Sequence, residues 1–210
     1  MDLSTIELIT KCLEIIGTIA FAVSGALVGI EGKMDILGIA ILGVTTACGG
    51  GILRDIILGI TPPASFVDST YITIALITSL IIFIPRLRKK LMKRKVLFDN
   101  VLLIMDSLGL GIFVVVGISV AAKTSYGLFL KCFVGVITGV GGGVLRDCMA
   151  DTTPFIFHKH FYCSAAIIGA IITVLMWNKS GEIISMFVGT GIIFALRLAA
   201  AHYRWKLPRA

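Results

Sequence analysis

The heptapeptide Gly49–Asp55, with the sequence GGGILRD, contains the residue types in this chain that could do chemistry, and a close copy, GGGVLRD, recurs at Gly141–Asp147. Each copy lies in an apolar run and places one positive and one negative charge directly after three glycines. Charged side chains within a membrane-spanning segment are costly, usually pair with one another, and mark ion or substrate pathways. The doubled motif therefore predicts one transport centre built from two matching halves.

We interpret the three glycines of each motif as a helix break, because glycine costs a helix about 1 kcal/mol relative to alanine. A break would leave free carbonyl groups, which carry the negative end of the helix dipole, beside two threonine hydroxyls. Such a surface stabilises cations. The candidate pore and gating residues are therefore Gly49, Gly50, Gly51, Arg54, Asp55, Gly141, Gly142, Gly143, Arg146 and Asp147, with Thr46 and Thr138.

The two arginines of the motifs need anionic partners, since an unpaired buried charge is strongly destabilising. The pseudo-symmetry of the motifs suggests crossed ion pairs, Arg54 with Asp147 and Arg146 with Asp55. Such pairs would brace or gate the centre. The sequence does not show which aspartate each arginine meets.

Two further carboxylates, Glu14 and Asp106, lie within apolar runs. Intramembrane carboxylates are rare and usually functional, so we expect both to line a polar path. For Glu14 the alternative is a local ion pair with Lys11, one helical turn away. For Ser24 and Ser119, helix packing is the favoured interpretation.

The composition indicates an all-α polytopic membrane protein. Of the 210 residues, 57% are apolar and only 15% are charged. Apolar runs long enough to cross about 30 Å of hydrocarbon lie near residues 6–29, 35–60, 68–85, 98–121, 126–150, 161–177 and 183–201. The formal charge of +7 is concentrated beside these runs, where it sets membrane orientation. Nucleic-acid binding is therefore not expected.

Residues 7–62 align without a gap on residues 99–154, so that Glu14 meets Asp106 and the two heptapeptides coincide. A repeat of three spans inserts its second copy upside down, and inverted repeats place their site near the bilayer midplane. We expect a first three-helix repeat at 1–85, a basic linker at 86–97, a second, inverted repeat at 98–178, and a seventh helix with a basic tail at 179–210. Because the seventh helix lies outside the repeat, we expect it to be peripheral.

The densest basic segment, Arg86–Lys95, predicts the orientation of the chain. By the positive-inside rule this loop faces the cytoplasm. Counting spans from it places the N-terminus outside the cell and the C-terminus, with the basic residues Arg197, Arg204, Lys206 and Arg209, inside. The favoured role of the loop is that of a topology signal, with binding of anionic membrane lipid as the alternative.

Other chemistry finds little support in the sequence. The glycine motif lacks the GK[ST] of a phosphate loop and the GxGxxG spacing of a dinucleotide site. No nucleophile–base arrangement or metal-ligand cluster stands out. We therefore expect no enzymatic activity, no cofactor, and no metal beyond transient monovalent cations in a pore.

With seven spans, two inverted repeats and a doubled GGG-x-L-R-D motif, the chain resembles prokaryotic members of the trimeric intracellular cation channels, also grouped as a glycine-transporter-like family of bacterial membrane proteins. The resemblance covers nearly the whole chain. It implies a homotrimer in the prokaryotic plasma membrane, with an hourglass pore permeable to potassium inside each protomer. The pore would be lined by both repeats and bent at the glycines. The lysine-bearing motif that animal members use for calcium and voltage sensitivity is not found here.

Two functions fit these observations. The first is a monovalent-cation channel, for potassium, that the arginines and aspartates gate or brace. The second is a secondary transporter of glycine or a similar small zwitterion. In a transporter a half-helix N-terminus and an arginine would hold the carboxylate of the substrate, while an aspartate or backbone carbonyls would hold its ammonium group.

Overall fold

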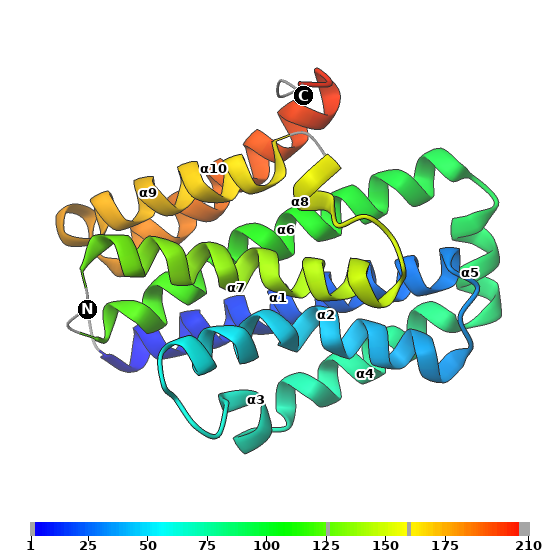
Figure 1. Cartoon of the computed structure of the whole chain (residues 1–210), viewed down its shortest axis with the longest axis horizontal. Coiled ribbons are helices and arrows are strands. Elements are labelled where there is room, and N and C mark those ends of the chain that lie inside the picture. Colours follow the sequence, from blue (N-terminus) through cyan, green and yellow to red (C-terminus); the bar gives the residue numbers. More distant parts are fainter. Residues whose placement is uncertain (1–2, 125–126, 159–160, 206–210) are drawn as a thin grey trace.

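The computed structural model describes residues 3–124, 127–158 and 161–205, and in these residues the regular structure is entirely helical (Figure 1). The sequence-based expectations include residues outside these ranges: 1–2 of the first repeat, 125–126 and 159–160 of the second, and 206–210 of the tail, among them Lys206 and Arg209. The helices are α1 (Leu3–Glu31), α2 (Ile36–Ile57), α3 (Ala64–Val67), α4 (Thr70–Phe83), α5 (Pro85–Met92), α6 (Lys95–Ala122), α7 (Leu128–Met149), α8 (Phe155–His158), α9 (Tyr162–Ser180) and α10 (Glu182–His202).

In the described part of the chain, six helices are long and apolar enough to cross a membrane, or seven if α4 and α5 count as one bent span. The seven expected spans correspond to α1, α2, α4, α6, α7, α9 and α10, with ends that differ by only a few residues. The bend between α4 and α5 is 69° and falls at Pro85, which begins α5. Proline is tolerated in a first helical turn and lacks the N–H that would continue α4.

The expected helix breaks at the glycine motifs are wrong, because α2 and α7 run through Gly49–Gly51 and Gly141–Gly143 as continuous helices. The glycines allow the two helices to cross closely. A Cβ on Gly50 would collide with the carbonyl oxygen of Thr138, and one on Gly142 would collide with that of Thr46. Small residues permit such close helix packing inside a membrane. The crossing therefore offsets the low helix propensity of glycine.

The crossing is antiparallel, as inverted repeats require. Leu53 of α2 lies over Gly141 of α7, and Leu145 of α7 lies over Gly49 of α2. In Figure 1 the two helices run side by side through the middle of the molecule, and the carboxyl end of α2 lies at the opposite end from that of α7. Residues after the glycines in the two motifs therefore point to opposite ends of the molecule.

The first helices of the two repeats, α1 and α6, pack around this crossing. Phe21 and Phe113 contact each other with ring centroids 5.2 Å apart. Phe21 packs directly against Gly109, and Phe113 lies 3.2 Å from the position of a Cβ on Gly17. The buried core thus has the same pseudo-two-fold arrangement as the motifs.

The seventh helix, α10, lies with α9 at one edge of the molecule (Figure 1), but its inner face makes buried contacts. Helix α10 packs against α6, where the carbonyl oxygen of Thr190 lies 3.0 Å from a Cβ built on Gly111, and against α9, where Ile193 fills the space over Gly169. It carries Arg197, which is only 2% exposed and lies in the helix rather than in a basic tail. Small residues on its neighbours allow the inner face of α10 to pack closely against them.

Candidate functional site

The first-repeat centre comprises Glu14, Arg54, Asp55 and Tyr71. The Nε of Arg54 donates to the Oδ1 of Asp55 at 2.8 Å. The other oxygen of Asp55, Oδ2, accepts from the backbone N–H of Ala64 at 2.8 Å. Asp55 is 1% exposed and Arg54 is 7% exposed. The aspartate therefore ties the loop after α2 to the guanidinium near the end of that helix.

Glu14 completes the first-repeat centre from α1. Its carboxylate accepts a hydrogen bond from the hydroxyl of Tyr71 on α4, and the ion pairs of the described residues do not include one with Lys11. Glu14 also lines a cavity of about 40 Å³, together with Thr18, Arg54 and Tyr71. This volume is sufficient for water. The centre thus presents one carboxylate, that of Glu14, and one guanidinium, that of Arg54, to this small cavity.

The second-repeat centre comprises Asp106, Arg146, Asp147, Tyr162 and Arg197. The Nη1 of Arg146 donates to the Oδ1 of Asp106 at 2.7 Å, and its Nε donates to the Oδ1 of Asp147 at 2.8 Å. The Oδ2 of Asp147 accepts from the backbone N–H of Phe155 at 2.8 Å, as Asp55 accepts from Ala64. The two motifs therefore make the same clamp on the loops that follow them.

Beyond this shared clamp, the second-repeat centre gains a second guanidinium. The Nη2 of Arg197 lies 3.6 Å from the Oδ2 of Asp106, and its guanidinium lies 4.5 Å from the centroid of the Tyr162 ring. Arg146 is completely buried and lies 4.4 Å from the centroid of the Phe155 ring. Two carboxylates and two guanidiniums therefore lie together inside the protein, each of them 2% exposed or less.

The predicted crossed ion pairs are wrong. Each motif arginine pairs with the aspartate that follows it in the chain, Arg54 with Asp55 and Arg146 with Asp147. The antiparallel crossing at the glycines explains this result, because it separates the two arginines toward opposite ends of the molecule.

The predicted free carbonyl ends beside Thr46 and Thr138 are also wrong, since both helices continue through these residues. The two hydroxyls donate at 2.6 Å to the carbonyl oxygens of Leu42 and Val134, four residues earlier in their own helices. Both threonines are completely buried. Their hydroxyls are thus satisfied within the helices.

Ser24 does more than pack helices, because its hydroxyl oxygen accepts from the Nη1 of Arg146 at 2.6 Å. This contact joins α1 of the first repeat to the motif of the second. Ser119 donates to the Oε1 of Glu182 at 2.5 Å, which ties α6 to the start of α10.

Sequence reasoning missed Tyr71, Tyr162 and Arg197. The two tyrosines are equivalent positions of the repeat once Pro63 is treated as an insertion in the first copy. Continuing the repeat past this proline would have found them. Arg197 lies outside the repeat, and its only signal was a positive charge within an apolar run.

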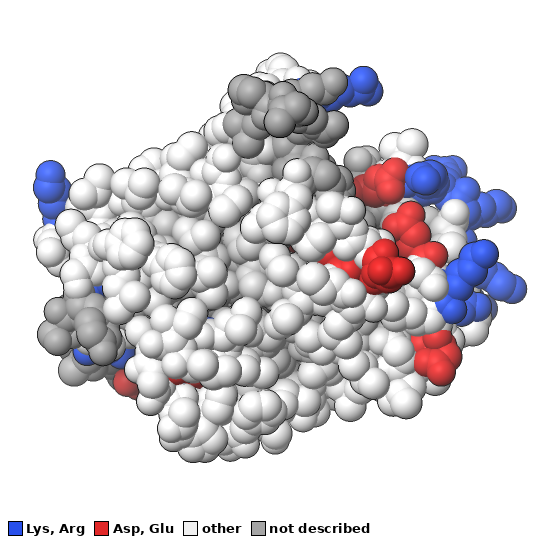
Figure 2. Space-filling view, viewed as in Figure 1, with Lys and Arg blue, Asp and Glu red and all other residues white. Residues whose placement is uncertain are grey.

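A second cavity, of about 470 Å³, lies beside the second motif. Its lining includes the carboxylates of Glu31, Asp99 and Asp147 together with Thr152 and Thr153. Figure 2 shows acidic side chains gathered at the end of the molecule where the basic residues are also concentrated, while most of the remaining visible surface is uncharged. The two cavities thus approach the helix crossing from opposite ends.

This combination of features defines a class of protein. The chain is a polytopic membrane protein with inverted repeats, a close glycine crossing, and a buried arginine–aspartate centre on each side of that crossing. Such architecture belongs to membrane channels and transporters, which hold intramembrane charges along their pathways.

Comparison with known proteins identifies the family. The family model described as "Glycine transporter" matches the chain twice, at residues 11–86 and 103–178. The UPF0126 inner membrane protein YadS of Escherichia coli K12 is 36% identical over 200 residues, which covers 93% of each chain.

A prokaryotic TRIC channel crystallised in 0.5 M KCl superposes with a TM-score of 0.87 at 30% identity, covering 96% of this chain and 100% of that one. The TRIC trimeric intracellular cation channel orthologue from Rhodobacter sphaeroides gives 0.83 at 31% identity, covering 94% and 99%. The chain belongs to this prokaryotic TRIC channel family.

Proposed function

We propose that the protein is a passive channel for monovalent cations, with potassium as the main permeant ion, and that the path runs within each protomer between the two cavities. The supporting observation is that both cavities are lined by carboxylates and approach the same helix crossing from opposite ends. Carboxylates along a low-dielectric path attract cations and exclude anions. Two of the solved relatives are described as cation channels, which supports a cation as the permeant ion.

The gate in this proposal is the apolar and ion-paired layer between the cavities. Phe21 and Phe113 are 1% and 8% exposed and contact each other beside the crossing. Arg146 donates hydrogen bonds to three polar partners, the side chains of Ser24, Asp106 and Asp147. Conduction requires this layer to move. Because a hydrophobic constriction can gate a pore by excluding water, a modest separation of the rings would be sufficient.

The proposed assembly is a homotrimer, as the description of the Rhodobacter sphaeroides relative states for that protein. The proposed membrane is the prokaryotic plasma membrane, in keeping with the name of the Escherichia coli relative. We place the basic segment at α5 in the cytoplasm by the positive-inside rule. The N-terminus then lies outside the cell and the C-terminus inside.

The experiment that tests this function is single-channel recording of the purified protein in planar bilayers under a KCl gradient. We expect discrete openings whose current reverses near the potassium equilibrium potential. Replacing potassium by sodium measures selectivity between cations, and replacing chloride by gluconate should leave the reversal potential unchanged. A current that follows the chloride gradient would contradict a cation channel.

The second candidate, a transporter of glycine, is favoured by the description of the matching family model. It predicts saturable uptake of labelled glycine into proteoliposomes. The continuous course of α2 and α7 removes the half-helix N-termini on which the substrate site was based. The cavity at Glu14, about 40 Å³, is suited to water and single ions. We therefore prefer the channel.

A further inference from the structure

Helix α5 is amphipathic and leaves the direction of α4 at 69°. If α4 crosses the membrane, α5 lies close to the membrane surface. Leu91 is buried and Leu87 is half-buried, whereas Arg86, Lys89 and Lys90 are exposed. The apolar face of α5 thus packs against the protein and its basic residues are left on the outside, where cationic side chains beside a membrane span attract anionic headgroups.

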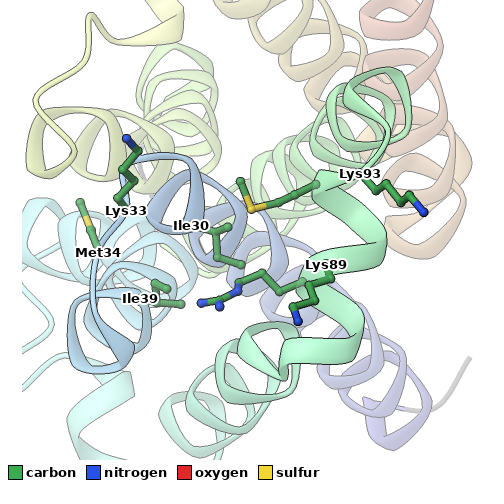
Figure 3. A pocket seen from close by; sticks show the side chains of 8 residues that line it. Ile30, Lys33, Met34, Ile39, Lys89 and Lys93 are labelled. Atoms are coloured by element: carbon green, nitrogen blue, oxygen red, sulfur yellow. The ribbon is translucent and has the colours of Figure 1, made fainter.

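A cavity of about 680 Å³ lies between α5 and the turn that joins α1 to α2. It is lined by four cationic side chains, Lys33, Arg88, Lys89 and Lys93, and by Ile30, Ile39 and two methionines. Figure 3 shows Lys33 and Lys89 on opposite sides of the cavity, with Ile30 and Ile39 between them. The cavity therefore combines a cationic rim with an apolar floor.

The cations of this cavity have no carboxylate in the lining and no ion-pair partner among the described residues. Of the acidic residues in the adjoining turn, Asp35 accepts from the backbone N–H of Gly38 at the start of α2, and Glu31 lines the other large cavity. Arg88 is positioned over the ring of Phe83 at 5.0 Å.

We propose that this cavity binds the headgroup of an anionic phospholipid, with the phosphate among the four cations and the start of an acyl chain over the isoleucines. Arginine and lysine form charge-assisted hydrogen bonds to phosphate oxygens. Basic pockets on the cytoplasmic side of membrane proteins suit such headgroups. A soluble phosphate shares this chemistry, but the apolar floor and the position of α5 at the membrane surface favour a lipid.

Native mass spectrometry of the detergent-solubilised protein tests the site without any measurement of conduction, so its result is independent of the proposed channel. The probes are phosphatidylglycerol, phosphatidylcholine and inorganic phosphate. The test variant, Lys89→Gln with Lys93→Gln, removes two cations from the cavity. The matched control, Lys90→Gln with Arg94→Gln, removes two exposed cations one residue further along, neither of which lines the cavity.

We expect wild type and control to retain phosphatidylglycerol at least tenfold more tightly than phosphatidylcholine. The test variant should bind phosphatidylglycerol roughly 25-fold more weakly, at about fivefold per cation near an anionic headgroup. Lys33→Gln, on the opposite wall, should weaken it roughly fivefold. Equal losses in test and control variants, or equal retention of both lipids, would overturn the site. Displacement of the lipid by an equimolar amount of inorganic phosphate would show that the ligand is a soluble phosphate and not a lipid.

Discussion

The first-repeat and second-repeat centres carry the same motif and make the same clamp on the following loop, yet their surroundings differ. Glu14 and Arg54 line a polar cavity, whereas Asp106 and Arg146 are completely buried. The first centre has one guanidinium for its two carboxylates, and the second has two, because α10 contributes Arg197. Duplication therefore produced one anionic centre beside a water-sized cavity and one neutral, more deeply buried centre, of which Asp147 lines the larger cavity. We infer that the first attracts cations and that the second holds the helices together.

The largest expected difference between the centres concerns stability. Asp106→Ala should leave Arg197 without a carboxylate partner and Arg146 with Asp147 alone, and should destabilise the protein by about 3–5 kcal/mol, as loss of one partner of a buried ion pair usually does. The equivalent change in the first centre, Glu14→Ala, should cost about 1 kcal/mol, because Glu14 is partly exposed and its loss strands no cation. Denaturation in detergent, followed by circular dichroism, measures both. Equal losses would contradict the distinction between the centres.

The glycine crossing should be destabilised by an alanine at Gly50 and should tolerate one at Gly51. Gly50→Ala places a methyl group on the carbonyl oxygen of Thr138, and overpacking of this kind costs about 1–3 kcal/mol. Gly51→Ala is the matched control, since the nearest atom to a Cβ there is the Nη2 of Arg54 at 3.8 Å. It should be neutral or stabilise the helix by up to about 1 kcal/mol. Thermal denaturation of the two variants separates a packing role from a need for flexible glycines.

If the glycines instead serve as hinges, Gly51→Ala would abolish conduction while the protein stays folded. We expect channel activity in planar bilayers to persist in this variant. Gly143→Ala, the same change in the second repeat, should be less well tolerated, because its Cβ would lie 3.0 Å from the hydroxyl of Tyr162.

The smallest expected difference involves the equivalent tyrosines. Tyr71→Phe removes the hydrogen bond to the carboxylate of Glu14. The loss should lower the free energy of unfolding by about 1 kcal/mol, which is small for a hydrogen bond to a charged group because the site is partly exposed. The hydroxyl of Tyr162 has no hydrogen-bond partner in the described structure, so Tyr162→Phe loses no hydrogen bond and should not destabilise the protein. A loss of stability in Tyr162→Phe would indicate that its hydroxyl is hydrogen-bonded within the second-repeat centre.

The spans and the repeat could be predicted from the sequence because both depend on local composition. Apolar runs of about 20 residues mark membrane helices directly, and the coincidence of the two heptapeptides fixes the repeat. The prediction of helix breaks failed for a physical reason. Glycine propensity describes an isolated helix, whereas the contacts of Gly50 and Gly142 with the opposite backbone are tertiary packing that outweighs it.

The partners of the charged residues could be predicted only in part. The sequence correctly indicated that Arg54, Asp55, Arg146 and Asp147 are paired, but symmetry alone suggested crossed pairs. The correct pairing depends on the distance between the arginines across the helix crossing, which is set by the three-dimensional arrangement. Arg197 could not be assigned, since nothing local distinguishes a buried arginine of α10 from one near a membrane surface.

The most direct test of the central claim is the unitary potassium conductance of Glu14→Gln compared with Glu7→Gln, which removes an exposed carboxylate two turns earlier on α1. A carboxylate about 4 Å from an ion in water-like surroundings contributes about 1 kcal/mol. We therefore expect Glu14→Gln to lower the conductance roughly fivefold at low salt, with a smaller effect as salt screens the charge. Glu7→Gln should conduct like the wild type. An unchanged conductance in folded Glu14→Gln protein would contradict a cation path through the first-repeat centre.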